Sequence, residues 1–284
     1  MLFILAASLP SFSQNKPAYK IFTGDGKKTD YVDMLKEISK ADMVFFGELH
    51  DNPVAHWLEI ELTKELFAIK GGNLILAAEM FETDNQLIID EYFAGIINES
   101  SFEAEVRKWN NYATDYKPLL NFAKEKGLKF VASNIPRRYA SIVSTGGFEA
   151  LQKISAEGLK YIAPLPVEYD PELPCYKDML TMSGIPKVHS GENFPKAQAI
   201  KDATMAKSIV NNWRKGQMVI HFNGSYHSDR KMGIIWYLNN YNPDIKFATI
   251  TTVVQDDIDR MDQESKGKAD FVIAIPSSMT KTYR

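Results

Sequence analysis

The chain has 284 residues, of which 45% are hydrophobic and 24% charged, and its net charge is −3. This composition is typical of a globular protein and excludes extensive disorder, because disordered chains contain fewer apolar residues. The nearly neutral charge gives no indication of nucleic-acid or anionic-membrane binding, both of which favour basic surfaces. The single cysteine, Cys175, excludes an intrachain disulfide and a cysteine-rich zinc site.

The first fourteen residues resemble the end of a secretory signal peptide. Residues 1–9 are apolar, small and polar residues follow, and a polar segment begins at Asn15. The apolar run is too short to span a bilayer, and no cysteine that could carry a lipid follows it. We therefore expect an exported protein, periplasmic or associated with the outer membrane, with one α/β domain over residues 15–284. The alternative for this segment is a buried first strand.

Strands and helices alternate along the chain. Residues 43–49 are apolar enough for a strand buried on both faces. Asn52 and Pro53 predict the start of a helix, and Gly71 predicts its end. Further strands are predicted at 74–81, 129–135, 217–223, 247–254 and 271–276, and further helices at 84–96, 101–110, 116–126, 196–213 and 229–240. This order predicts an α/β fold with a mostly parallel central sheet flanked by helices.

Residues of about 155–195 interrupt this alternation. They are rich in proline and contain three tyrosines, so they are too aromatic for a solvated linker. We expect an irregular or helical cap inserted over the sheet.

Polar side chains occur where the predicted strands of the main run end. Ligands of parallel sheets bind beyond the carboxyl ends of the strands, so these side chains are expected to meet in one cluster. Buried charges also cost several kcal/mol unless they are paired or bound. The cluster would contain Glu48, His50, Glu79, Asn134 and His227.

Two of these strand ends carry the pattern Gly-x-x-His, at residues 47–50 and 224–227. The glycine would let the backbone turn sharply, so that the histidine points back into a cleft. Imidazole and carboxylate groups together suit Zn, Mn or Fe, and a metal-bound water with a glutamate as base would hydrolyse an ester or peptide bond. The candidate metal ligands, and catalytic residues if the chain is a hydrolase, are Glu48, His50, Glu79 and His227.

Other polar residues have more than one interpretation. His221 lies within an apolar strand and is expected to be a hydrogen-bonded core residue, whereas His56 on the first helix is expected at the surface or in helix packing. Arg137 and Arg138 could bind a carboxylate or propionate, or simply begin a solvated helix. One face of the helix 196–213, with Gln198, Asp202 and Met205, belongs to the core or to the cleft.

Five segments between about residues 40 and 240 resemble, in order, the ChaN-like family of iron-regulated haem-binding proteins. They are Phe-Phe-Gly-Glu-Leu-His, Ala-Ala-Glu-Met-Phe, Ser-Asn-Ile-Pro-Arg, Ala-Gln-Ala-Ile-Lys-Asp-Ala-Thr-Met-Ala and Asn-Gly-Ser-Tyr-His. The resemblance implies a parallel-sheet domain with a small cap, haem held between cap and sheet, a homodimer, and outer-membrane haem-uptake machinery as a partner. Family members that are lipoproteins carry an N-terminal lipobox cysteine, which this sequence lacks.

The family is more distantly similar to the Tiki metalloproteases and the erythromycin esterases. That similarity implies an active site at Glu48, His50, Glu79 and His227. The ChaN-like resemblance instead implies a tyrosine of the cap as the haem ligand. Haem also needs cationic or amide partners for its propionates, and Arg137 is the candidate. Tyr169 and Tyr176 are preferred over Tyr161 because they flank the proline-rich turn, and His189 and Met182 lie nearby in the sequence.

Three hypotheses follow. The favoured one is a haem-binding or haem-trafficking protein outside the cytoplasm. The second is a metal-dependent hydrolase, and the cleft of such an enzyme could be retained as a binding site. The third, an interaction domain with no small ligand, is disfavoured by the polar strand ends.

Overall fold

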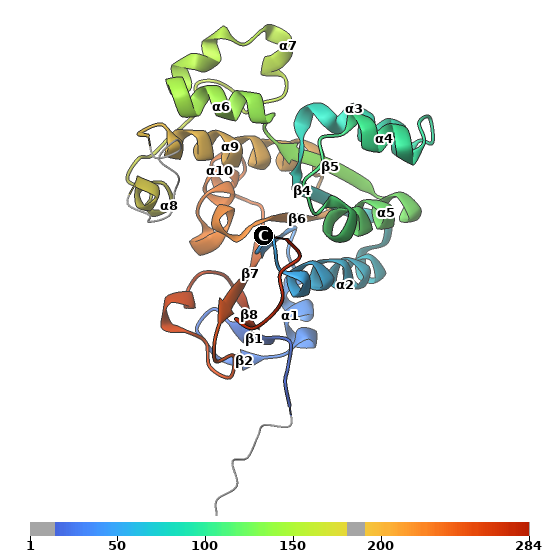
Figure 1. Ribbon diagram of the computed structural model, residues 1–284, viewed down its shortest axis with the longest axis vertical. Helices are drawn as coiled ribbons and strands as arrows, with labels where there is room; N and C mark the ends of the chain where they lie inside the picture. The colour runs from blue at the N-terminus through green and yellow to red at the C-terminus, as the bar shows by residue number, and fades with distance from the viewer. Residues whose placement is uncertain (1–14, 181–190, 284) are drawn as a thin grey trace, which may run out of the picture.

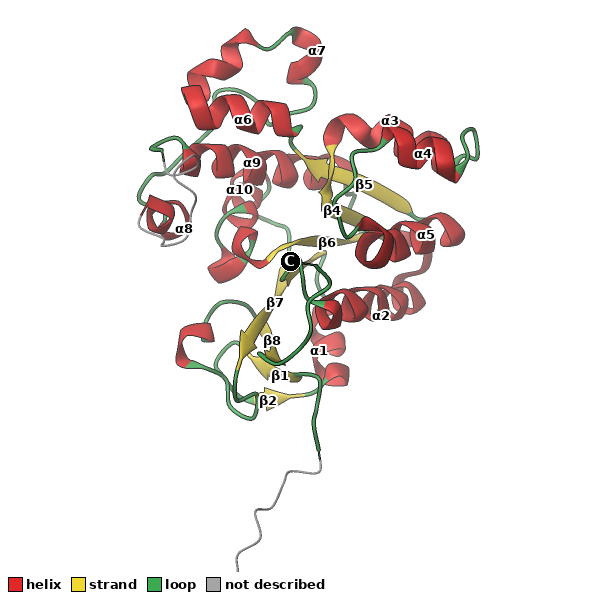
Figure 2. Cartoon of the chain, viewed as in Figure 1, coloured by secondary structure: helices red, strands yellow, loops and turns green. Residues whose placement is uncertain are grey.

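The computed structural model describes residues 15–180 and 191–283. Its centre is an eight-stranded sheet with the order β2-β1-β8-β7-β3-β6-β4-β5 (Figures 1 and 2). The strands are β1 (Lys20–Thr23), β2 (Lys28–Thr29), β3 (Met43–Glu48), β4 (Leu74–Glu82), β5 (Lys129–Asn134), β6 (Met218–Gly224), β7 (Phe247–Gln255) and β8 (Phe271–Pro276). Strands β3 to β8 pair in parallel, and β1 is antiparallel to β2 and β8. The predicted α/β fold with a mostly parallel sheet is confirmed.

Helices cover both faces of the sheet (Figure 1). One hydrophobic core joins the sheet to α1 (Tyr31–Ile38), α2 (Pro53–Lys70), α3 (Gln86–Phe93), α4 (Glu99–Glu105) and α5 (Lys117–Lys126). A second core joins the other face to α6 (Arg137–Gly146), α8 (Pro174–Lys177), α9 (Phe194–Asn212) and α10 (Ile234–Tyr241). The short α7 (Ala156–Leu159) lies between α6 and α8 in the sequence.

The two cores explain why the first four residues of β3 are all apolar. Successive side chains of a strand point to opposite faces. Phe46 therefore packs into the core with α2, and Phe45 into the core with α9. All six residues of β3 are buried, as predicted for a strand covered on both faces.

Helix α2 begins and ends as predicted. The side chain of Asn52 accepts hydrogen bonds from the backbone N–H groups of Val54 and Ala55, at 3.0 and 3.2 Å, and Pro53 occupies the first turn. Gly71 ends the helix with a φ of 54°, a conformation that costs glycine little. This cap fixes the helix directly after the end of β3.

The segment after β6 differs from the prediction. A helix was expected from residue 229, but Ser225–His227 and Asp229–Lys231 form single 3₁₀ turns and α10 begins only at Ile234. Gly233 has a φ of 55°, and a Cβ there would lie 2.4 Å from the backbone oxygen of His227. Glycine at this position thus allows the chain to fold back closely against His227.

The region predicted as a cap contains α7, α8 and a 3₁₀ turn at Asp178–Leu180, joined by irregular chain. The signal-peptide-like segment, Met182 and His189 lie outside the described residues. No helix in the described part of the chain combines the length and apolarity needed to cross a bilayer.

Candidate functional site

Two adjoining cavities of about 440 and 470 Å³ lie at the carboxyl ends of β3, β4, β5 and β6. We call them together the strand-end cleft. Four residues line both cavities, namely Glu79, Trp109, Phe194 and Lys201. The first cavity is also lined by Asn134, Ile135 and Arg137. The second cavity is also lined by Glu48, His50, Met179, Gly224, Tyr226 and His227. Each volume falls within the range of roughly 300–1,000 Å³ that small-molecule and cofactor sites have.

The sheet geometry brings the carboxylates of this cleft together. Glu48 is the last residue of β3 and lies beside Gly224, the last residue of β6, in the parallel register. The pairing of β4 with β5 shifts between Ala78 and Glu82, so Glu79 lies within an irregularity of the strand. Bulges of this kind often redirect a side chain next to a functional site. Glu79 thereby contacts both Gly224 and His227.

His227 lies between two buried carboxylates. Its Nδ1 is hydrogen-bonded to Asp202 Oδ1, and its Nε2 lies 3.3 Å from Glu79 Oε1. Burial opposes protonation of this ring, but the two carboxylates raise the pKa of His227 to about 10. Burial likewise opposes ionisation of Glu79, but the His227 charge and the N–H of Gly224, 2.8 Å away, hold the pKa of Glu79 below its usual range. At neutral pH the histidine is therefore an imidazolium between anions.

His50 faces the cleft and is held by Glu48. Its Nδ1 lies 2.7 Å from Glu48 Oε1, which also accepts a hydrogen bond of 2.7 Å from the hydroxyl of Tyr116. Burial opposes both charged forms, yet the contact raises the pKa of His50 and lowers that of Glu48 to about 2. The ring of His50 meets the Trp109 ring edge to face at 4.9 Å. The pair thus presents one partly exposed imidazole beside an aromatic wall.

The glycines of the two Gly-x-x-His segments act differently from the prediction. Gly224 has a φ of −55° and Gly47 also lies outside the left-handed region, so neither makes the sharp turn expected. Both instead allow close approach. A Cβ on Gly224 would lie 2.7 Å from His50 Nε2, and one on Gly47 would lie 2.9 Å from the Cα of Ser225.

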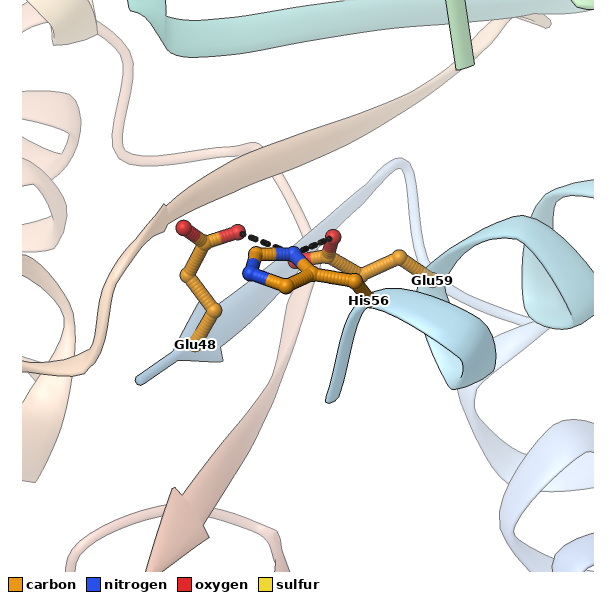
Figure 3. A group of neighbouring side chains, drawn as sticks. All are labelled: Glu48, His56 and Glu59. Atoms are coloured by element: carbon orange, nitrogen blue, oxygen red, sulfur yellow. Dashed lines mark hydrogen bonds and ion pairs between the residues drawn. The ribbon is translucent and has the colours of Figure 1, made fainter. Parts of the chain in front are cut away.

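A second group of polar residues lies under the cleft, between β3 and α2 (Figure 3). His56, expected at the surface or in helix packing, is only 6% exposed and lies 3.1 Å from Glu59 Oε2 and 3.6 Å from Glu48 Oε2. Burial and the charge of Glu48 raise the pKa of Glu59 well above its usual range. The sequence contains one signal for the contact between His56 and Glu59. The two residues are three positions apart on a helix face that also carries Leu62.

The structure brings some predicted site residues together and leaves others apart. Glu48, His50, Glu79, Asn134, Arg137 and His227 all line the strand-end cleft. None of the three cap tyrosines is among the residues that line it in the described part of the chain. Tyr176 is buried and donates a 2.8 Å hydrogen bond to Asp202, Tyr169 lines a separate surface cavity with Trp236, and Tyr161 is half-buried.

The predicted metal ligands do not form the tightest ligand group. Within residues 15–180 and 191–283, one group of three possible ligands has its ligand atoms within 4.8 Å of one another, and it consists of Glu48, His56 and Glu59. His221 is buried and contacts Ser133 and Asn223, which confirms its prediction as a hydrogen-bonded core residue.

Sequence reasoning did not identify Trp109, Phe194 and Lys201 as parts of the cleft. Trp109 was predicted to lie in a helix at 101–110, but α4 ends at Glu105 and Trp109 lies in the loop that follows, whose path no local pattern predicts. Lys201 could have been found, because it lies three residues after Gln198, whose cleft role was considered.

A comparison with family profiles identifies one family, and a comparison with solved structures identifies proteins of the same fold. The profile of the family described as "Haem-binding uptake, Tiki superfamily, ChaN" matches residues 34–238. A structure described as cofacial heme binding to ChaN of Campylobacter jejuni has a TM-score of 0.68 and 20% identity, covering 90% of this chain and 96% of that one.

Two more distant structures share the fold. A succinoglycan biosynthesis protein has a TM-score of 0.52 and 11% identity over 88% of this chain and 92% of its own. A Bacillus cereus protein has a TM-score of 0.51 and 12% identity over 89% and 93%. No curated protein sequence matches the chain.

Proposed function

Because the chain belongs to the ChaN family of haem-binding uptake proteins in the Tiki superfamily, we propose that it binds haem in the strand-end cleft and acts in haem uptake or trafficking outside the cytoplasm. The observation that carries this proposal is the combination of aromatic walls and unpaired cations around one cleft. Haem is a flat apolar ligand with two propionates, so it requires both.

The residues of the cleft fit this ligand. Trp109, Phe194 and Ile135 offer apolar surface. Arg137 and Lys201 have no acidic partner within 4 Å among the described residues, so both are available to carboxylates. His227 lies 3.3 Å from Glu79 and offsets part of its negative charge, which reduces the repulsion of an anionic ligand.

The two cations would act in different ways. A guanidinium can bind a carboxylate through two parallel hydrogen bonds, whereas an ammonium acts as a compact point charge. We assign Arg137 and Lys201 to the propionates on this basis. Each would orient the ligand and neutralise one negative charge.

Haem supplies an iron that requires an axial ligand from the protein. Among the predicted tyrosines we propose Tyr169, with Tyr161 as the alternative; because neither lines the strand-end cleft of its own chain, the ligand would come from the second protomer of the proposed homodimer. The hydroxyl of Tyr169 has no hydrogen-bond partner in the described part of the chain, whereas that of Tyr176 already donates to Asp202. Binding of iron by Tyr176 would break this buried contact.

The test is a hemin titration of the purified protein, followed by absorbance. We expect a saturable Soret band, a dissociation constant at least tenfold higher for the Arg137→Met/Lys201→Met double variant, and a shifted band for Tyr169→Phe. Lys207→Met is the control, because Lys207 lies on the same helix outside the cleft. A flat titration of the wild type would refute the proposal.

Homodimerisation, export and contact with outer-membrane uptake machinery extend the same proposal. Cofacial haem, as described for the C. jejuni protein, would place two haem-bearing clefts face to face. Light scattering with and without hemin should then detect a dimer on haem binding, and cell fractionation should place the protein outside the cytoplasm.

A metal-dependent hydrolase is the second candidate, because Glu48, His50, Glu79 and His227 line one cavity. Carboxylates contact both ring nitrogens of His227, so a metal bound by this residue would have to displace one of these contacts. Metal-dependent hydrolysis of a p-nitrophenyl ester with added Mn, Co or Zn would support the enzyme.

A further inference from the structure

Glu48 forms a group with His56 and Glu59 (Figure 3), and of these three residues only Glu48 also lines the strand-end cleft. The side chains are 1%, 6% and 0% exposed. Glu48 Oε2 and Glu59 Oε1 are buried and have no hydrogen-bond partner among the described residues. Buried carboxylate oxygens without partners are costly, so a cation bound at this place would stabilise them.

Both ring nitrogens of His56 have partners, and these differ between the two sides of the ring. Its Nε2 lies 3.0 Å from the backbone oxygen of His50 and 3.4 Å from Asp115 Oδ2, and both oxygens accept. Nε2 therefore carries a proton, and Nδ1 faces Glu48 and Glu59. One ligand atom from each of the three side chains thus lies within 4.8 Å of the other two.

The spacing of these atoms suits a metal ion. His56 Nδ1 lies 3.1 Å from Glu59 Oε2 and 3.6 Å from Glu48 Oε2. In a tetrahedral site with bonds of roughly 2.0–2.1 Å, ligand atoms lie ~3.4 Å apart, between these two distances. Two carboxylates also balance the charge of one divalent ion.

Neighbouring residues form hydrogen bonds to Glu48 and His56, as the residues around the ligands of metal sites commonly do. Metal-binding histidines usually donate their other N–H to a carbonyl or carboxylate, as His56 does. Ligating carboxylates are themselves hydrogen-bonded, and Glu48 Oε1 is held by Tyr116 and His50. The arrangement is therefore in place before any ion binds.

We propose that Glu48, His56 and Glu59 bind one divalent transition metal of the zinc, manganese or ferrous class. Imidazole and carboxylate ligands suit these ions. The site would be structural, since it lies within the core between β3 and α2. Through Glu48, whose other oxygen holds His50, the ion would also fix an imidazole of the cleft wall.

The first test uses untagged, haem-free protein treated with a chelator and then titrated with Co²⁺. Bound metal is measured by visible absorbance and, for Zn²⁺, by equilibrium dialysis. We expect about one ion per chain and at least about tenfold weaker binding by Glu59→Gln. Glu65→Gln, exposed on the same helix, is the matched control and should bind as the wild type does.

Two results would overturn the proposal. One is a wild type that binds no metal in stoichiometric amount. The other is a Glu59→Gln variant that binds normally while Glu79→Gln does not, which would place the ion in the cleft. X-ray absorption of the Co²⁺ form decides even if Glu59→Gln fails to fold, because this site supplies one imidazole, whereas His50 and His227 would supply two.

Discussion

His227 and Asp202 form a hydrogen-bonded ion pair inside the protein, and neither side chain is more than 6% exposed. Asp202 also accepts the hydroxyl of Tyr176, and Glu79 lies at the other ring nitrogen. The network connects α9 and α8 to the loop after β6. If a neutral side chain replaced one of the charged ones in this network, another charge would remain buried without a partner.

Replacement of Asp202 tests this dependence. We expect Asp202→Asn to lower the free energy of unfolding by about 3–5 kcal/mol, as the loss of one partner of a buried ion pair does. Urea denaturation measures the change. Asp244→Asn, in an exposed loop, should change the value by less than about 0.5 kcal/mol. Equal effects of the two variants would show that the pair contributes no stability.

The raised pKa of His227 makes stability depend on pH. The folded value is about 10, against about 6.5 in an unfolded chain. The stabilising contribution is therefore complete below about pH 6.5 and disappears as the pH rises to about 10, because the folded state binds the extra proton. Unfolding free energies of the wild type should fall across this window relative to those of His227→Gln. If the unfolding free energies of the two proteins changed with pH in the same way, the protonated state assigned to His227 would be wrong.

Gly224 should not tolerate a side chain. In Gly224→Ala the new Cβ would lie 2.7 Å from His50 Nε2, and we expect a loss of about 1–3 kcal/mol, typical of overpacking. The control is Gly72→Ala, where no atom lies within 4 Å. His50→Ala should restore part of the loss, as a double-mutant cycle by urea denaturation would detect. No rescue would mean that another contact causes the effect.

Tyr176 and Tyr169 should behave differently when replaced. Tyr176→Phe removes a buried hydrogen bond to a charged group, so we expect a loss of about 1.5–3 kcal/mol in stability and an unchanged Soret band. Tyr169→Phe should shift the band with little loss of stability. Hemin titration and thermal unfolding of both variants separate the roles. A Soret band lost only in Tyr176→Phe would reverse the assignment.

The sequence was sufficient where the local pattern determines the structure. β3 is an apolar run because both faces are covered, and α2 begins at Asn52 and ends at Gly71 because these residues satisfy backbone groups or allow a positive φ. The strand-end residues Glu48 and Glu79 could be placed because parallel strands end at one edge. These predictions required no knowledge of distant contacts.

The sequence was insufficient where partners come from distant elements. Glu59 and His56 look like ordinary polar residues of an amphipathic helix, and only the tertiary fold brings Glu48 beside them. Trp109 contacts His50 from a loop about sixty residues away along the chain. Two-residue β2 lies below the length at which an alternating pattern can be recognised.

The two carboxylate oxygens of Glu48 face two different sites. Oε1 holds His50 at the cleft, and Oε2 points toward His56 and Glu59 in the interior. A substitution of Glu48 would therefore disturb the cleft and the buried group at once. Its effect on function could not be attributed to one of these two sites. Mutations that separate the two roles have to be made at residues that belong to only one site, such as Glu59 in the buried group and Lys201 in the strand-end cleft.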